Sequence, residues 1–362
     1  MKILFDHQMF SRQRFGGISR YFANVYHTLQ NTENLDAEIS LINTNNYYVK
    51  ELNGTISHLF GKNLLKKYKR NYRWNRRYSK YIIDKNNYDL FHPTYFNPYF
   101  LKNLKKPFVL TVHDMIYEAM PQYFHSNDPL PYHKRILMEK AEKIIAISET
   151  TKADILTYSD VKEEKIEVIY HGIDLSTAKL QDVPNLPSKY ILFVGDRELY
   201  KNFHIVADAF KVLSIKYPDL RLVLAGGGII NYGDSEYLRR NGILDKTIQI
   251  SATDQQLNLI YSKAICFVYP SLYEGFGLPI LEAFKNSCPV LLSNCSCFEE
   301  IAGNAASYFE GQSLQSLVQK LELIIENQLI RKEMIELGKQ KLLQYPIENC
   351  VSKTIELYRH IV

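Results

Sequence analysis

The sequence predicts an α/β protein with two doubly wound domains, each built on a parallel sheet. Short runs rich in Val, Ile, Leu and Phe alternate with longer amphipathic stretches through both halves of the chain. Strands that are continuously apolar are buried on both faces, as in parallel sheets covered by helices. A length of 362 residues also exceeds what one hydrophobic core usually serves. Strand–helix alternation in both halves therefore favours two such domains.

The expected strands follow one another at regular intervals. In the first half they are KILFD (2–6), EISLI (38–42), YDLFH (88–92), FVLTVHD (108–114), KIIAIS (143–148) and IEVIY (166–170). In the second half they are YILFVG (190–195), RLVLAG (221–226), TIQI (247–250), ICFVYP (265–270) and PVLLS (289–293). Helical patterns separate most of them. Residues 44–86 show no clear strand, and after about Gln312 only helical patterns remain.

A segment without periodicity marks the expected domain boundary. Residues 174–189, DLSTAKLQDVPNLPSK, contain two prolines and read as a linker. We therefore expect an N-terminal domain over 1–174, a linker over 175–189 and a C-terminal domain over 190–345. The last helix, 346–362, could pack within the second domain or cross back onto the first.

Composition excludes several classes of protein. Five cysteines without a C-x-x-C pair exclude a disulfide framework and the usual zinc spacings, and they favour a reduced, cytoplasmic setting. Asp6 and His7 stand where a signal peptide needs its apolar stretch, and no apolar run is long enough to span a membrane. The net charge is only +5, which does not suggest a globally basic nucleic-acid-binding protein.

Candidate ligand-binding residues follow the strands, because ligands bind beyond the carboxyl ends of strands in open α/β sheets. The segment YEGFGLPILEAF has the richest set. Gly275 and Gly277 let a ligand approach the backbone, and Leu278 begins a helix whose N–H groups favour phosphate or sugar oxygens. Glu274 and Glu282 can accept hydrogen bonds from hydroxyl groups. A plain strand–turn–helix connection with incidental acids is the alternative.

A second candidate set follows the strand YILFVG. Arg197 and Lys201 open the next helix, and two cations beside a helix N-terminus suit a diphosphate. A solvated basic turn would explain them equally simply. Gly226 begins a run of three glycines after the strand RLVLA, but the run lacks the G-x-G-x-x-G pattern of dinucleotide sites.

The first half offers two weaker signals. Gly17 belongs to a glycine pair that opens a helix, where a bound group could lie against the backbone or where the strand and helix simply pack closely. His113 closes the strand FVLTV, either as a functional group or as a packing histidine held by Asp114. No Asp-x-Asp metal clamp, P-loop, H-E-x-x-H or G-x-S-x-G motif occurs.

The motifs together resemble those of the retaining glycosyltransferases of family 4, which have the GT-B fold of two facing Rossmann-like domains. The resemblance covers nearly the whole chain. It rests on FDHQMFSRQRFGGISRYF, TVHDMIYEAMPQYF, IIAISETTKADI, KIEVIYHGID, VGDRELYKNF, LAGGG and VYPSLYEGFGLPILEAF, in that order. EGFGLPILE is the most specific, with two glutamates separated by seven residues.

In the second domain, the resemblance implies a role for each matching residue. Glu274 would bind hydroxyls of the donor sugar, and Glu282 the ribose hydroxyls of the nucleotide. Phe276 and Gly277 would offer backbone N–H groups, and Lys201 would neutralise the departing diphosphate.

The remaining matches imply a donor held by residues of both halves. Arg197 would assist at the diphosphate, Gly17 would let the phosphates approach the first domain, and His113 would contact the sugar near the reacting carbon. Leu278 and Gly226 belong to the same donor-binding segments. No cofactor and no metal are expected, because the nucleoside-diphosphate sugar is a substrate.

A basic segment is the remaining feature. Between Lys62 and Lys80 there are nine Lys or Arg and no Asp or Glu. Residues 62–82 predict an amphipathic helix with Leu64, Tyr68, Tyr72, Tyr78 and Ile82 near one face. Such a helix suits an anionic membrane surface, although its aromatic side chains could instead pack in the core. Binding of RNA is a weaker alternative, since no nucleic-acid module accompanies the segment.

The sequence therefore predicts a hexosyltransferase that moves a hexose or deoxyhexose from a nucleoside-diphosphate sugar to a hydroxyl of a lipopolysaccharide, capsule or other surface glycan. The glycan or lipid-linked glycan acceptor would be held by the first domain. GDP-mannose is the donor that the resemblance favours, ahead of UDP- or dTDP-sugars. A catalytically silent nucleotide- or glycan-binding subunit and a nucleotide-sugar epimerase or phosphorylase of the same fold are the alternatives.

Overall fold

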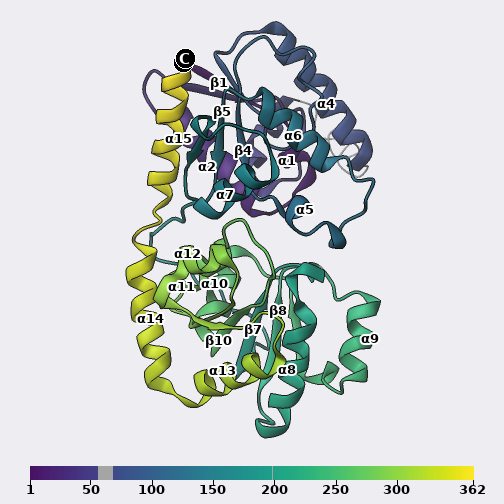
Figure 1. The fold of residues 1–362 in the computed structure, drawn as a ribbon, viewed down its shortest axis with the longest axis vertical. Helices are drawn as coiled ribbons and strands as arrows, with labels where there is room; N and C mark the ends of the chain where they lie inside the picture. The colour runs from purple at the N-terminus through teal and green to yellow at the C-terminus, as the bar shows by residue number, and fades with distance from the viewer. Residues whose placement is uncertain (56–67, 198) are drawn as a thin grey trace. The chain divides into compact units, whose positions relative to one another are not determined.

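The chain divides into two compact units (Figure 1). Unit 1 consists of Met1–His171 together with Glu348–Val362, and unit 2 of Gly172–Ile347. The computed structural model describes residues 1–55, 68–197 and 199–362.

The described part of unit 1 contains six strands in two parallel groups, with the orders β2-β1-β3 and β4-β5-β6. The strands are β1 (Lys2–Phe5), β2 (Asp36–Ile39), β3 (Leu90–His92), β4 (Val109–Val112), β5 (Lys143–Ala146) and β6 (Ile166–Val168). One parallel bridge between Phe91 and Phe108 joins the groups. Leu4, Leu110 and Ile144, from three different strands, share one buried core.

The helices of unit 1 include one from the end of the chain. They are α1 (Gln8–Arg12), α2 (Gly17–Gln30), α4 (Tyr68–Lys85), α5 (Ile116–Ala119), α6 (Leu130–Lys140), α7 (Glu149–Tyr158) and α15 (Ile347–Ile361). The fully buried Tyr358 of α15 hydrogen-bonds through its hydroxyl to Nδ1 of His92 at 2.5 Å. Of the two placements that the sequence left open for the last helix, the structure has the one on the first unit (Figure 1).

Helix α4 buries a polar face and leaves much of its aromatic face exposed. Asn71, Asn75 and Ser79 are buried at successive turns, whereas Tyr68 is 52% exposed. The polar face is buried because Asn75 pairs with the backbone of the loop that follows β2. Periodicity identified the helix but not its buried face. Leu64, expected on the aromatic face, lies outside the described residues.

Unit 2 is built on a parallel sheet of the doubly wound kind, with the order β12-β11-β10-β7-β8-β9 among its described strands. The strands are β7 (Tyr190–Val194), β8 (Arg221–Ala225), β9 (Thr247–Ile250), β10 (Cys266–Tyr269), β11 (Val290–Ser293) and β12 (Ser307–Phe309). The first five match the expected runs. The edge strand β12 was not expected, because its three residues form no apolar run.

Helices cover both faces of this sheet. They are α8 (Phe203–Lys216), α9 (Tyr232–Arg240), α10 (Asp254–Lys263), α11 (Leu278–Lys285), α12 (Ser296–Ala302), α13 (Leu314–Glu326) and α14 (Gln328–Leu342). Helices α8 and α13 pack together over one core, and α11 packs against α14. Among the helices of the described ranges, none has the length and apolar character needed to cross a bilayer.

The segment expected as a linker lies against unit 2. Lys285 donates a hydrogen bond to the carbonyl of Asp174 at 2.6 Å, and the N–H of Gln181 donates to the carbonyl of Gln255 at 3.2 Å. The first segment of unit 1 ends at His171, three residues before the expected boundary.

Candidate active site

The candidate residues of unit 2 come from three chain segments that the sheet brings together. Strands β10, β7 and β8 are neighbours and run parallel, so their carboxyl ends lie at one edge. Glu274 and Gly277 follow β10, Arg197 and Lys201 follow β7, and Gly226 follows β8. Sequence-distant residues thus share the edge where ligands bind in such sheets.

An ion pair joins two of these segments. Nζ of Lys201 lies 2.5 Å from Oε1 of Glu274, and both side chains are largely buried, with 17% and 14% exposed. The ring of Tyr269 lies beneath, with its centroid 5.9 Å from the same Nζ. Burial, followed by the neighbouring Glu274 carboxylate, holds the pKa of Tyr269 well above its ordinary value. The edge thus presents a cation and a carboxylate that restrain each other.

Helix α11 begins at Leu278, as its sequence predicts. Gly277 precedes it with φ of 96°, a left-handed conformation that side chains rarely adopt. A Cβ there would lie 2.9 Å from Cδ1 of Ile280 and 3.2 Å from the ring of Phe298. Phe276 is 3% exposed, so its backbone and not its side chain is the part that a ligand could reach. In the first turn Pro279 has no N–H and the N–H of Ile280 bonds to the carbonyl of Gly277, so the N–H groups of Gly277 and Leu278 are the candidates for an anionic ligand.

Glu282 lies one turn inside α11. The hydroxyl of Tyr261 in α10 donates to its Oε2 at 3.3 Å. Tyr261 is fully buried, so this contact orients the carboxylate from below while leaving it able to accept further hydrogen bonds.

Arg197 is held by the glycine loop after β8. Its Nε donates to Asp234 at 3.1 Å, and its Nη2 donates to the carbonyls of Gly227, Gly228 and Ile229 at 3.0–3.2 Å. Its side chain is 4% exposed. Nη1 has no hydrogen-bond partner among the described residues. The arginine therefore fixes the conformation of the glycine loop through Nε and Nη2, whereas Nη1 takes no part in these bonds.

The glycine loop itself requires glycine. Gly226, Gly227 and Gly228 have φ of 77°, 65° and 70°, all left-handed. A Cβ on Gly227 would collide with the carbonyl of Gly195, which belongs to the loop after β7. The two loops therefore approach each other more closely than side chains would permit.

Two histidines lie together in unit 1. The rings of His113 and His171 stack with centroids 5.6 Å apart and planes 21° apart. His113 is 7% exposed, and neither of its ring nitrogens has a hydrogen-bond partner among the described residues. Burial, with smaller effects of His92 and Lys134, lowers the pKa of His113 to about 3. The imidazole is therefore neutral at physiological pH.

Gly17 is the first residue of α2, immediately beyond the loop that follows β1. The hydroxyl of Ser19 donates a hydrogen bond to the carbonyl of Gly16 at 3.1 Å. The N–H of Ser19 donates to Oε1 of Gln13 at 3.3 Å. Part of this helix N-terminus is thus already occupied by protein groups.

Sequence reasoning missed three residues that contact candidate residues within their own unit: Asp234 bonds to Arg197, Tyr261 bonds to Glu282, and His171 stacks on His113. His171 follows β6 at its carboxyl end, so the rule that selected His113 could have found it. Asp234 and Tyr261 stand inside helices, where no sequence signal distinguished them. Within residues 1–55, 68–197 and 199–362, no cluster of three or more His, Cys, Asp or Glu side chains could hold a metal ion.

Two family models match consecutive parts of the chain. Residues 15–177 match the model described as Glycosyltransferase Family 4, and residues 177–341 match that of the Glycosyl transferases group 1. Together they span both units.

Known proteins agree with these matches. The chain is 25% identical to O-antigen chain mannosyltransferase B of Escherichia coli over 316 residues, which are 78% of this chain and 77% of that protein. It is 28% identical to O-antigen chain mannosyltransferase RfbU of Salmonella typhimurium over 59% of this chain and 60% of that protein. Sucrose-phosphate synthase of Thermosynechococcus elongatus shares the fold, with a TM-score of 0.76 at 17% identity over 99% and 98% of the two chains.

Proposed function

The chain belongs to glycosyltransferase family 4 and has the GT-B fold, and we propose that it transfers mannose from GDP-mannose to a hydroxyl of a bacterial surface glycan, with retention of configuration. The names of its two O-antigen relatives support the choice of mannose. The acceptor is a growing polysaccharide such as that of a lipopolysaccharide.

The ion pair of Lys201 and Glu274 is the observation that carries the proposal. When the donor binds, the ammonium group of Lys201 pairs with the diphosphate instead of with Glu274. Glu274 then accepts hydrogen bonds from the sugar hydroxyls. Glu282, oriented by Tyr261, accepts the ribose hydroxyls. The first turn of α11, from Gly277 onward, adds N–H groups and the positive end of its dipole.

The remaining side chains complete the site. Arg197 shapes the glycine loop and contributes Nη1, its nitrogen without a partner among the described residues, to the phosphates. In unit 1, the neutral His113 hydrogen-bonds the sugar near the reacting carbon, and the N-terminus of α2 at Gly17 accommodates phosphate oxygens.

In the transfer step, the bond between the anomeric carbon and the diphosphate oxygen breaks while the acceptor oxygen bonds to the same face of that carbon. The acceptor proton passes to the departing phosphate oxygen. Because charge develops on the diphosphate, the preorganised Lys201 and the α11 terminus stabilise the transition state more than the bound donor.

Calorimetric titration with GDP, UDP, dTDP and CMP tests the donor assignment. We expect GDP to bind most tightly, and the Glu282→Gln variant to lose most of this affinity. Glu336→Gln serves as the matched control, because Glu336 lies on α14 and pairs with Lys339. Preference for another nucleotide overturns the choice of GDP, and an unchanged Glu282→Gln affinity removes Glu282 from the site.

Incubation with GDP-mannose and a glycan acceptor tests the reaction itself. We expect an α-linked mannose in the product, which the one-bond C–H coupling of the anomeric carbon identifies by NMR. A β-linked product contradicts retention. Tight nucleotide binding without any transfer would favour a silent nucleotide-binding subunit.

A further inference from the structure

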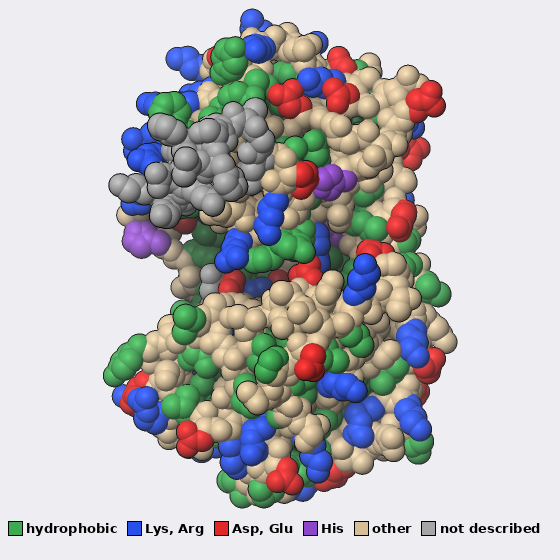
Figure 2. All heavy atoms as spheres, turned by 180° about the vertical axis from the view of Figure 1, so that it is seen from behind, with side chains coloured by type: hydrophobic (Ala, Val, Ile, Leu, Met, Phe, Trp, Pro, Cys, Tyr) green, Lys and Arg blue, Asp and Glu red, His purple; other side chains and the backbone are tan. Residues whose placement is uncertain are grey.

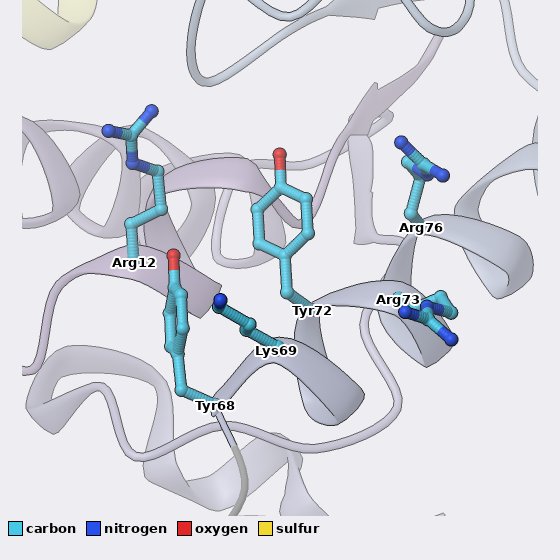
Figure 3. Close-up of a pocket in the computed structure, with 6 residues that line it drawn as sticks. All are labelled: Arg12, Tyr68, Lys69, Tyr72, Arg73 and Arg76. Carbon is cyan, nitrogen blue, oxygen red and sulfur yellow. The ribbon is translucent and has the colours of Figure 1, made fainter.

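A pocket that does not include the candidate active-site residues lies in unit 1, on the elements α1 and α4. It has a volume of about 380 Å³, within the roughly 300–1,000 Å³ of small-molecule sites. The lining residues are Arg12, Tyr68, Lys69, Tyr72, Arg73 and Arg76. Arg12 comes from α1 and the other five come from successive turns of α4 (Figure 3). None of them belongs to the proposed donor site.

The pocket is strongly cationic. Four of its six lining residues carry a positive charge, and none carries a negative one. Among the described residues, no carboxylate lies within ion-pair distance of these four cations, whereas Arg197 pairs with Asp234, and Arg239 with Glu236. In Figure 2, Lys and Arg side chains gather on the part of unit 1 that carries α4, at the upper left. Four uncompensated charges repel one another, and a bound anion would relieve that repulsion.

Arg12, Tyr68 and Tyr72, three of the hydrogen-bond donors of the pocket, pack against aromatic rings. The guanidinium of Arg12 lies over the ring of Tyr95 at 4.6 Å. Tyr72 packs edge-on against the buried ring of His7, with centroids 4.9 Å apart. Burial raises the pKa of Tyr72 to about 12, so its hydroxyl remains a donor. The rings of Tyr68 and Tyr72 are 6.2 Å apart, and both hydroxyls point the same way in Figure 3.

The buried polar face of α4 holds this helix against α1, so that the two helices lining the pocket stay together. The amide nitrogen of Asn75 donates to the hydroxyl of Ser11 in α1 at 2.9 Å and to the carbonyl of Asn43 at 2.9 Å. The opposite face of α4 is therefore fixed to α1 by directional bonds, which an apolar face would not supply. These bonds fix the helix that carries the cations relative to Arg12 before any ligand arrives.

We propose that this pocket binds a phosphate monoester or diphosphate group. A phosphate monoester carries up to two negative charges, and a diphosphate group carries two or more. Their acceptor oxygens match the guanidinium groups, the ammonium group and the two phenol hydroxyls of the pocket. A single carboxylate would leave most of these donors unused. The group can be carried by a soluble phosphorylated compound or by the headgroup of an acidic lipid, since both present the same chemistry.

Titration with inorganic pyrophosphate at constant ionic strength tests the site. The Lys201→Ala background weakens binding at the proposed donor site, and the comparison of pocket and control variants within that background does not depend on the proposed function. We expect Arg73→Gln/Arg76→Gln to weaken pyrophosphate binding at least tenfold. Both side chains are exposed, so the variant keeps its fold, which circular dichroism verifies.

A matched control is available on the same helix. Arg77→Gln/Lys80→Gln removes the same charge from two exposed residues that do not line the pocket. We expect this variant to bind pyrophosphate within twofold of its parent. Equal losses in the two double variants, or no loss in Arg73→Gln/Arg76→Gln, overturn the proposal.

Vesicle sedimentation identifies the source of the phosphate. Phosphatidic acid carries a monoester, and phosphatidylglycerol is the anionic diester control. Sedimentation with phosphatidic acid that Arg73→Gln/Arg76→Gln abolishes supports the pocket and assigns a lipid headgroup. Pocket-dependent pyrophosphate binding without sedimentation supports it and assigns a soluble ligand. Equal sedimentation with both lipids, unaffected by the variant, contradicts a phosphate-specific pocket.

Discussion

Lys201 and Glu274, 73 positions apart in the chain, form an ion pair of 2.5 Å at the carboxyl edge of the sheet in unit 2. The pair exists because β7 and β10 are neighbours. Each charge compensates the other in a mostly buried environment. Removal of one partner would leave a buried charge uncompensated, which costs folding free energy. Under the proposed function, the bound donor gives each residue a new partner. Its diphosphate pairs with Lys201, and its sugar hydroxyls bond to Glu274.

Substitution of Lys201 by alanine should weaken binding of the nucleoside diphosphate. We expect a ~10–100-fold loss, because one charge-assisted contact to the phosphates disappears. Calorimetric titration measures it. Unchanged affinity would place Lys201 outside the site.

Substitution of Glu274 by glutamine should separate nucleotide binding from sugar transfer. We expect the affinity for GDP alone to stay within about threefold or to rise, since Lys201 is released from its partner. Turnover with GDP-mannose should fall by about 100-fold, because the sugar loses a charged acceptor. A parallel loss of GDP affinity and turnover would contradict this division of roles.

The contact between Glu282 and the ribose can be isolated by a double-mutant cycle with 2′-deoxy-GDP as the second change. Glu282→Gln and loss of the 2′-hydroxyl should each weaken binding, and together by less than the product of the two factors. Tyr261→Phe removes the hydroxyl that orients Glu282 and should produce a smaller loss. Fully multiplicative effects would show that Glu282 does not touch the ribose.

The glycine loop offers a pair of matched substitutions. Gly227→Ala and Gly228→Ala both place a side chain at a left-handed φ, of 65° and 70°, which costs about 1 kcal/mol or more. Only at Gly227 does the new Cβ also meet the backbone of Gly195, whereas nothing lies within 4 Å at Gly228. We expect Gly227→Ala to be the more destabilising in thermal unfolding. Equal melting temperatures would refute the close approach of the two loops.

Buried histidines should make unit 1 sensitive to acid. Burial lowers the pKa of His7, His92 and His113 to about 3 from the ordinary 6.5. Between these values the unfolded chain binds protons that the folded chain does not, so stability falls as pH falls through this window. Each histidine contributes roughly 1 kcal/mol per pH unit there.

Urea unfolding between about pH 4.5 and pH 6 measures this dependence. Trp74 in α4 is the only tryptophan of the chain, so its fluorescence reports on unit 1. We expect His113→Asn to show a shallower pH dependence than the unmodified protein. His360→Asn is the control, because His360 is exposed near the end of α15. An unchanged slope in His113→Asn would mean that His113 is protonated in the folded protein.

Sequence patterns predicted the sheets well where strands are continuously apolar, as for β7 and β8. They failed for β12, whose residues Ser307–Phe309 form a short edge strand that needs no apolar run. They found helix α4 but did not indicate its buried polar face, because buried amides such as Asn75 can bond to the backbone just as apolar side chains can pack.

The candidate site shows the same division between local and tertiary information. The loop residues were found because they follow strands, which is a local property. The Lys201–Glu274 pair depends on the order of strands in the sheet, and the bond of Arg197 to Asp234 depends on how a helix packs beside a loop. Neither depends on spacing along the chain, so periodicity and motifs could not reveal them.

The placement of α15 has a consequence for synthesis of the protein. Tyr358, four residues from the carboxyl terminus of this sequence, is fully buried in unit 1 and bonds to His92. A ribosome makes the whole of unit 2 before that tyrosine emerges, so unit 2 has all its residues while unit 1 still lacks its closing helix. The amino-terminal unit, although its translation begins first, therefore cannot reach its native state before the residues of unit 2 have been made, and the nascent chain exposes the surface that α15 covers until then.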